Sequence, residues 1–179
     1  MINVKHVKRF ISSVGRRRRF ATNNELFELD AIPAPGSPFH IAIPCHDLKL
    51  ARHFYGTVLG LTEGRRSEDK WQDYSISGHQ LVCHFVGNDY RCIDYTNPVD
   101  GDEVPVPHFG LVLNLSEFNA FAERLQNANV KFIIPPTKRF EGKPGEQMTM
   151  FFKDPSNNNL EFKSITNSNY LFARYNVKV

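Results

Sequence analysis

Apolar and polar positions follow a regular order from about residue 36 onwards. Residues 39–45 alternate as a half-buried strand does, and residues 48–58 then carry apolar side chains at helical spacing. Asp47 precedes this expected helix as an N-cap, and Gly60 follows it as a stop. Further strand-like stretches lie at 61–63, 71–76 and 80–86. The first half of the chain therefore predicts a β-α-β-β-β unit.

The second half of the chain repeats that order. Residues 107–115 are strand-like, and the helix that follows has Ser116 as its expected N-cap and Asn129 at its left-handed end. Strand-like stretches at 131–134, 148–152 and 160–163 complete the unit. Repetition of a whole unit indicates two copies of one supersecondary structure.

Histidines occupy the same place in both units, His40 and His108 on the first strand of each. When these two residues are superposed, His84 falls close to Glu161 in the last strand. Glu161 lies between two apolar residues, so it points away from the core that they form. Because an unpaired carboxylate is costly to bury, Glu161 faces either water or a site that supplies a cation.

Two longer stretches of the chain are HIAIPCHDLKLARHFYGTVLGL at residues 40–61 and FFKDPSNNNLEF at residues 151–162. They resemble the opening and closing motifs of the vicinal oxygen chelate superfamily, which includes glyoxalase I, extradiol dioxygenases, methylmalonyl-CoA epimerase and antibiotic-resistance proteins. Asn129 and Asn157 stand where the family usually has glycine, and asparagine also tolerates a positive φ. The resemblance implies an α+β fold: two tandem βαβββ modules form a curved mixed sheet, a half-barrel around a metal site, with helices outside.

The resemblance divides the chain into parts. It implies a domain over 37–165, with modules at 37–86 and 106–165 joined by a polar linker. Residues 166–179 are then a C-terminal tail, and residues 25–36 are a linker that follows the basic segment 1–24.

A metal site is the second implication of the resemblance. Carried over position by position, the ligands fall on His40 and His108 in the first strands and on Glu161 in the last strand. Two imidazoles and one carboxylate are the ligand set of non-haem iron(II), so Fe²⁺ is the first expectation, and Zn²⁺, Ni²⁺, Mn²⁺ and Co²⁺ fit the same set. Without the motifs, histidines on apolar strands would be interpreted as core residues.

The role of His84 stays open between three alternatives. It falls nearest to a fourth ligand position, but a slip of one residue would turn its strand face around. His84 is then a ligand, a catalytic acid or base that faces the substrate, or a packed core histidine.

Residues 137–147 differ in composition from the rest of the second unit. Two glycines, a proline and five charged residues predict a mobile lid at the mouth of the site. Lys138, Arg139 and Lys143 would bind an anionic group of the substrate. The alternative is an ordinary solvated hairpin loop.

The chemistry that the resemblance implies is chelation of a small oxygenated substrate through two neighbouring oxygens. An extradiol-dioxygenase-like reaction is the first expectation, because ring-cleaving members use two histidines and one glutamate, with His84 as the extra imidazole. The alternative is a glyoxalase-like lyase, isomerase or epimerase in which Glu161 shuttles a proton, although glyoxalase I usually has a carboxylate where His84 falls. A second alternative is a non-catalytic protein that binds a drug or metabolite. Two-module members usually dimerise, so we expect a homodimer.

Basic residues are concentrated at the N-terminus. Seven of the 22 lysines and arginines lie in residues 1–24, before the first acidic residue, and the remainder of the chain has a net charge of about −4. An acidic body argues against a nucleic-acid-binding surface. Apolar residues at helical spacing over 1–14 and an arginine-rich stretch before Ala21 are typical of a mitochondrial transit peptide. The alternative is a basic tail on a cytoplasmic protein.

Cysteine usage and hydropathy exclude two further classes. Cys45, Cys83 and Cys92 form no paired motif, which predicts reduced thiols and argues against a disulfide framework or a cysteine-based zinc site. No apolar run approaches the ~20 residues that span a bilayer, so we expect no membrane contact.

Overall fold

The computed structural model describes residues 18–22, 25–29, 36–143 and 145–172. The chain divides into two compact units, Met1–Pro38 and Phe39–Val179. In the first unit, strands β1 (Arg18–Thr22) and β2 (Glu25–Leu29) form an antiparallel pair, although β2 falls in the stretch expected to be a linker. The helix expected over residues 1–14 lies outside the described residues.

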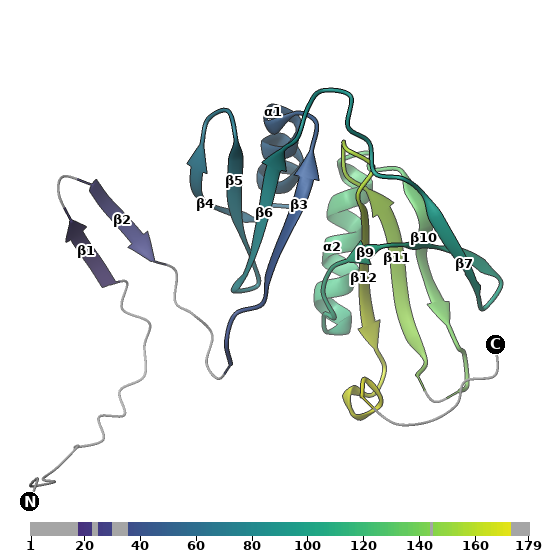
Figure 1. Ribbon diagram of the computed structural model, residues 1–179. Coiled ribbons are helices and arrows are strands. Elements are labelled where there is room, and N and C mark those ends of the chain that lie inside the picture. Colours follow the sequence, from purple (N-terminus) through teal and green to yellow (C-terminus); the bar gives the residue numbers. More distant parts are fainter. Residues whose placement is uncertain (1–17, 23–24, 30–35, 144, 173–179) are drawn as a thin grey trace, which may run out of the picture. The chain divides into compact units, whose positions relative to one another are not determined.

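Module 1 has the element order that its sequence predicts. Its elements are β3 (His40–Cys45), α1 (Leu48–Arg52), the π-helical turn η1 (His53–Val58), β4 (Thr62–Ser67), β5 (Trp71–Ile76) and β6 (His79–Phe85). The sheet order is β3-β6-β5-β4, with β3 parallel to β6 (Figure 1). Gly60 ends the helical segment with a φ of 76°, as expected.

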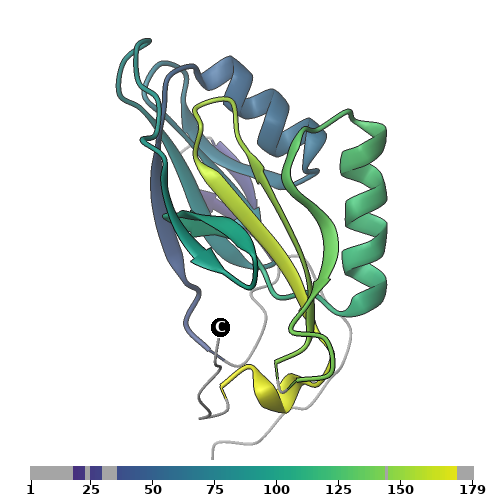
Figure 2. The same cartoon turned by 90° about the vertical axis from the view of Figure 1, so that its right-hand side faces the viewer.

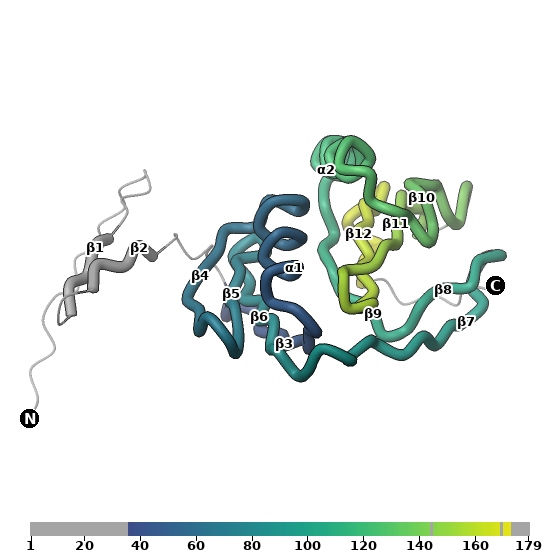
Figure 3. The backbone as a smooth tube through the Cα atoms, turned by 90° about the horizontal axis from the view of Figure 1, so that it is seen from above, coloured from purple at the N-terminus to yellow at the C-terminus, as the bar shows by residue number. Residues whose placement is uncertain are grey.

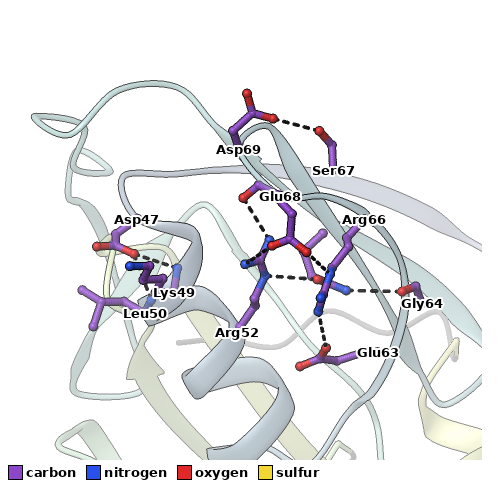
Figure 4. Close-up of polar contacts among 11 residues, drawn as sticks. Asp47, Lys49, Leu50, Arg52, Glu63, Gly64, Arg66, Ser67, Glu68 and Asp69 are labelled. Atoms are coloured by element: carbon purple, nitrogen blue, oxygen red, sulfur yellow. Dashed lines mark hydrogen bonds and ion pairs between the residues drawn. The ribbon is translucent and has the colours of Figure 1, made fainter.

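Two local contacts fix the helix of module 1, and Figure 4 shows both. The Asp47 carboxylate accepts hydrogen bonds from the backbone N–H groups of Lys49 and Leu50, at 2.7 and 3.0 Å, which confirms it as the N-cap. At the other end of α1, Arg52 donates to the Glu68 carboxylate at 3.1 Å. The helix is therefore tied to the turn between β4 and β5.

Module 2 repeats this arrangement. Its elements are β9 (His108–Phe109), α2 (Leu115–Asn127), β10 (Phe132–Arg139), β11 (Gln147–Lys153) and β12 (Asn159–Ile165), followed by the 3₁₀ turn η2 (Ser168–Tyr170). The sheet order is β10-β11-β12-β9, with β9 parallel to β12. Asn129 and Asn157 have positive φ values of 56° and 66°, as expected for substitutes of glycine. The two sheets stay separate and form no closed barrel among the described strands.

The N-cap of α2 corrects a sequence prediction. Asn114, not Ser116, caps the helix: its side chain accepts from the Glu117 backbone N–H, and the Glu117 carboxylate accepts from the Asn114 backbone N–H in return. This reciprocal capping box satisfies two backbone donors, whereas a cap at Ser116 would satisfy one.

One hydrophobic core joins the two modules. It contains Leu81 and Tyr55 from module 1 together with Phe118 and Phe152 from module 2, all buried. Figure 2 shows α2, in green, along one flank of the module 2 strands. The Arg124 side chain of α2 also donates to two backbone carbonyls at the end of η1, each at 2.7 Å. Phe39–Val179 is therefore one domain of two modules. None of the described helices is long and apolar enough to cross a bilayer.

The polar linker between the modules contains a hairpin that we did not expect from its sequence. Strands β7 (Tyr95–Val99) and β8 (Asp102–Val106) pair in antiparallel order around Asp100 and Gly101, which both have positive φ. An Asp-Gly pair, here between Val99 and Asp102, is a known signal for a two-residue hairpin turn. Figure 3 shows α2 on one side of the module 2 sheet and this hairpin on the other.

Candidate metal centre

The register of the strands decides which residues correspond in the two modules. In module 1, His40 lies opposite Gln80 in the parallel β3–β6 pair. In module 2, His108 lies opposite Asn159 in the parallel β9–β12 pair. Gln80 and Asn159 are therefore equivalent positions on the last strand of each module.

Counting from these positions shows that Val82, not His84, corresponds to Glu161. Val82 and Glu161 each lie two residues beyond the partner of the histidine, whereas His84 lies two residues further along β6. The alignment of His84 with Glu161 expected from the sequence is therefore shifted by two residues. A slip of two residues keeps every side chain on its face, so alternation alone does not detect it.

His108 and Glu161 meet on the face of the module 2 sheet opposite α2. The His108 Nε2 atom lies 3.3 Å from the Glu161 Oε2 atom. The His108 Nδ1 atom lies 2.7 Å from the carbonyl oxygen of Pro105, which only accepts hydrogen bonds, so Nδ1 carries a proton. If Nε2 is unprotonated, its lone pair faces a carboxylate. A cation, either a proton or a metal ion, therefore belongs between the two atoms.

The surroundings of Glu161 keep it ionised. The residue is 9% exposed, its Oε1 accepts from the Thr149 hydroxyl at 2.8 Å, and its Oε2 lies 3.3 Å from the Lys163 Nζ atom. Burial alone would raise the pKa of Glu161, but His108, Lys163 and Thr149 together lower it to about 2. The hydrogen bond to Glu161 raises the pKa of His108 against the opposing effect of its burial.

His108 and Glu161 fit two ligands of a divalent ion. Two ligand atoms about 2.1 Å from one ion at a right angle are about 3 Å apart, close to the 3.3 Å between Nε2 and Oε2. The contact from Nδ1 to a backbone carbonyl is the one that metal-bound histidines usually make. The Lys163 ammonium would have to turn away to admit a metal. Within the described residues, no group of three His, Cys, Asp or Glu side chains is placed to hold an ion.

His40 and His84 lie apart from this pair. His40 is exposed at the start of β3, with Nδ1 2.8 Å from the Gln80 Oε1 atom. His84 is exposed near the end of β6, opposite Trp71 on β5. His40 lies beside Gln80, and Gln80 and His84 are four positions apart along β6, a distance of about 13 Å. Module 1 therefore presents two separate histidines, not a pair.

The three basic residues of the expected lid have different surroundings. Arg139 is 5% exposed on β10, and its guanidinium donates to the Val99 carbonyl oxygen and lies 3.9 and 3.8 Å from the carboxylates of Asp100 and Asp102. Lys138 is exposed and lies 3.3 Å from Glu141. Lys143 is exposed in the turn after β10. The charge of Arg139 is therefore already neutralised by the β7–β8 hairpin.

The hairpin supplies site residues that the sequence analysis missed. Val104 of β8 packs in a buried cluster with Ile134 and Phe151, and Pro105 holds His108. The Phe151 ring meets the His108 imidazole edge to face at 5.2 Å. The hairpin thus covers the Glu161 face of module 2 and orients its histidine.

Comparison with known proteins shows the family. A family model, the Glyoxalase/Bleomycin resistance protein/Dioxygenase superfamily, matches residues 37–162. The chain belongs to this superfamily. The match ends at Phe162, so it includes both His108 and Glu161.

Solved structures of this superfamily share the fold. A glyoxalase/bleomycin resistance protein/dioxygenase from Alicyclobacillus acidocaldarius is 32% identical, with a TM-score of 0.65, over 78% of this chain and 98% of that one. A lactoylglutathione lyase from Agrobacterium tumefaciens is 18% identical, with a TM-score of 0.54, over 79% and 100%. A fosfomycin resistance protein from Listeria monocytogenes is 16% identical, with a TM-score of 0.51, over 77% and 98%. No curated protein sequence matches the chain.

Proposed function

We propose that this superfamily member is a divalent-metal-dependent enzyme that binds a small substrate through two neighbouring oxygens. The observation that carries the proposal is the contact between His108 Nε2 and Glu161 Oε2 at 3.3 Å. The far side of each group is held in place, the imidazole by Pro105 and the carboxylate by Thr149. Such outer contacts orient ligands and are characteristic of metal centres.

His40 is the proposed third ligand. It lies on the first strand of module 1, as His108 does in module 2, and it is exposed. Because it does not join the group in the described part of one chain, we propose that His40 of a second copy completes the site. The active form is then a homodimer.

The side chains around Glu161 would prepare the site for charge. A bound divalent ion would supply a Lewis acid that stabilises negative charge on the two substrate oxygens. Glu161 balances the charge of the ion, and Thr149 holds one of its oxygens so that the other faces His108. Val104 and Phe151 exclude water from one side, which strengthens these electrostatic interactions.

An extradiol-dioxygenase-like reaction is the first candidate. Val82 occupies the position equivalent to Glu161 in module 1, and a valine side chain offers no ligand atom. The ligands would then be two histidines and one carboxylate, a set that suits Fe²⁺ and would support the chemistry of a chelated substrate with dioxygen.

A glyoxalase-like isomerisation is the second candidate. It requires a carboxylate that accepts and returns a proton at a substrate carbon. Glu161 is ionised, and Thr149 holds its Oε1, so Oε2 is the oxygen that would take up and return the proton once it had left the ion. Zn²⁺ or Ni²⁺ would be expected in this case.

Metal content of the full chain, purified without chelator, tests the proposal. We expect about one ion per site, and at least a tenfold weaker metal affinity in His108→Ala, Glu161→Gln and His40→Ala. His84→Ala is the matched control, an exposed histidine on the same face as Gln80 that should retain its metal. Iron favours the dioxygenase and zinc or nickel the isomerase. Absence of metal under all conditions would contradict both and leave a non-catalytic binding protein.

A further inference from the structure

A row of polar side chains crosses the sheet of module 1 from His40. The His40 Nδ1 atom lies 2.8 Å from Gln80 Oε1, and Gln80 Nε2 donates to Asp73 Oδ2 at 3.1 Å. These residues stand on β3, β6 and β5, which are neighbours in the sheet (Figure 1). None of them except His40 was singled out by its sequence pattern.

The hydrogen-bonding chemistry of this row has one consistent solution. An ionised Asp73 carboxylate only accepts, so the Gln80 NH₂ group must face it. The Gln80 carbonyl oxygen then faces His40 and requires a proton on Nδ1. A rotated amide would place two acceptors against each other at Asp73. In neutral His40 the lone pair is therefore on Nε2, on the side away from Gln80.

Asp73 is held firmly enough to set this orientation. It is 6% exposed and accepts from the Arg65 Nη2 atom at 3.2 Å. The Arg65 guanidinium lies over the Trp71 ring, 5.8 Å from its centroid. Opposite Asp73 on β6 is Val82, which offers no competing hydrogen bond.

The same tautomer results in module 2 by a different route. His108 places its Nδ1 proton on the Pro105 carbonyl oxygen, while the counterpart of Gln80, Asn159, donates to the Pro107 carbonyl oxygen at 3.1 Å. Both histidines thus present Nε2. The two histidines share a tautomer although the acceptors for their Nδ1 protons are not equivalent residues. In module 1 the acceptor is the Gln80 side chain, and in module 2 it is the Pro105 backbone.

We propose that Gln80, oriented by Asp73, is a positioning residue that fixes His40 as the Nδ1–H tautomer and leaves Nε2 free to bind a cation. That Nε2 binds a cation depends on the proposed function, whereas the fixed tautomer of His40 does not. A neutral histidine in water populates both tautomers. If His40 is already fixed as the Nδ1–H tautomer, cation binding at Nε2 no longer costs the free energy of selecting that tautomer. Outer contacts of this kind typically change metal affinity by about 10- to 100-fold.

The tautomer is measured directly by ¹⁵N NMR of the imidazoles in the full chain, free of metal and at a pH where they are neutral. We expect His40 to carry its proton on Nδ1 in the unmodified protein and to shift towards Nε2–H in Gln80→Leu. Gln80→Glu keeps an acceptor for His40 but sets a second carboxylate against Asp73, so it is combined with Asp73→Asn, whose amide can donate to it. The double variant Asp73→Asn/Gln80→Glu should restore the Nδ1–H form. Ser75→Ala is the control, because Ser75 lies opposite Gln80 but outside the row.

Titration with Co²⁺ alone tests the consequence. Gln80→Leu should weaken Co²⁺ binding about tenfold, with recovery in the double variant Asp73→Asn/Gln80→Glu and no change in Ser75→Ala. An Nε2–H tautomer in the unmodified protein, or an unchanged tautomer in folded Gln80→Leu, overturns the proposal. A fixed Nδ1–H tautomer in a protein that binds no Co²⁺ contradicts the proposed function instead.

Discussion

Module 1 and module 2 share their order of elements and strands, yet their first and last strands meet differently. β3 pairs with β6 over six consecutive residues, whereas β9 pairs with β12 over two, and the pairing resumes beyond Gly110 only at the single bridge Val112–Lys163. Two residues after the histidine, module 1 has Ala42 and module 2 has Gly110. A Cβ atom added to Gly110 would lie 1.7 Å from the Glu161 carbonyl oxygen. In module 2 the backbone at Gly110 therefore lies against the backbone of Glu161, whereas module 1 has room for the methyl group of Ala42 at the equivalent place.

The faces opposite the helices differ as well. Module 2 carries the His108–Glu161 pair beneath the β7–β8 hairpin, and module 1 carries His40 and His84 exposed, with Val82 in place of the glutamate. Duplication therefore preserved the fold, while the ionisable residues and their cover diverged. Three predictions address this difference.

Gly110→Ala should have the largest effect. The added methyl cannot be accommodated without moving the Glu161 backbone, so the free energy of unfolding should fall by about 3 kcal/mol or more. For a chain of this size, the melting temperature should fall by about 6–12 °C. Ala42→Gly is the matched change in module 1 and should cost at most about 1 kcal/mol. Equal effects of the two variants in thermal unfolding would show that the modules do not differ here.

The ion pair should make stability depend on pH in metal-free protein. The lowered pKa of Glu161 contributes stability above about pH 4.5, which is lost as pH falls towards 2. The raised pKa of His108 contributes stability below about pH 6.5, which is lost as pH rises through the folded value. Glu161→Gln should therefore cost most between these limits, roughly 2–3 kcal/mol.

Urea unfolding of the native protein and Glu161→Gln over this pH range measures the difference. A difference that does not vary with pH would mean that His108 and Glu161 do not interact as a charged pair. His84→Ala serves as the reference in module 1, because an exposed histidine should change stability by less than about 0.5 kcal/mol.

Arg139→Met should have the smallest effect of the three. Removing the guanidinium leaves Asp100 and Asp102 partly solvated, so the cost should be about 1–2 kcal/mol. Amide hydrogen exchange in β7 and β8 should accelerate because the hairpin loses its anchor. Lys138→Met on the same strand removes only exposed contacts and should leave the exchange unchanged. Unchanged exchange in Arg139→Met would show that apolar packing alone holds the hairpin.

Most of the fold was predictable because its signals are local. Asp47 as a cap, Gly60 and Asn129 as helix ends and the strand at 71–76 are all confirmed. The second helix cap was wrong by two residues, since Asn114 and Ser116 are both acceptable caps and only the contact with Glu117 decides between them. The Asp100–Gly101 signal was present in the sequence, but the polar composition around it favoured a linker.

The candidate site was predictable only in part. Its family motifs pointed to His108 and Glu161, which the structure places in contact. The equivalence of His84 with Glu161 was wrong, because alternation has a period of two and does not distinguish shifts by two residues. The sequence did not indicate a role for Gln80 and Asp73 in orienting His40, since amides and carboxylates on half-buried strands are usually solvated.

By itself, the sequence determined the duplicated order of strands and helices and the face on which Glu161 lies. Both follow from periodicity within a few neighbouring residues. Only the tertiary structure decided that His108 meets Glu161, that Gln80 orients His40, and that the β7–β8 hairpin covers one module. These contacts join residues up to about 50 positions apart, and they depend on strand register and on packing between elements, which local patterns do not specify.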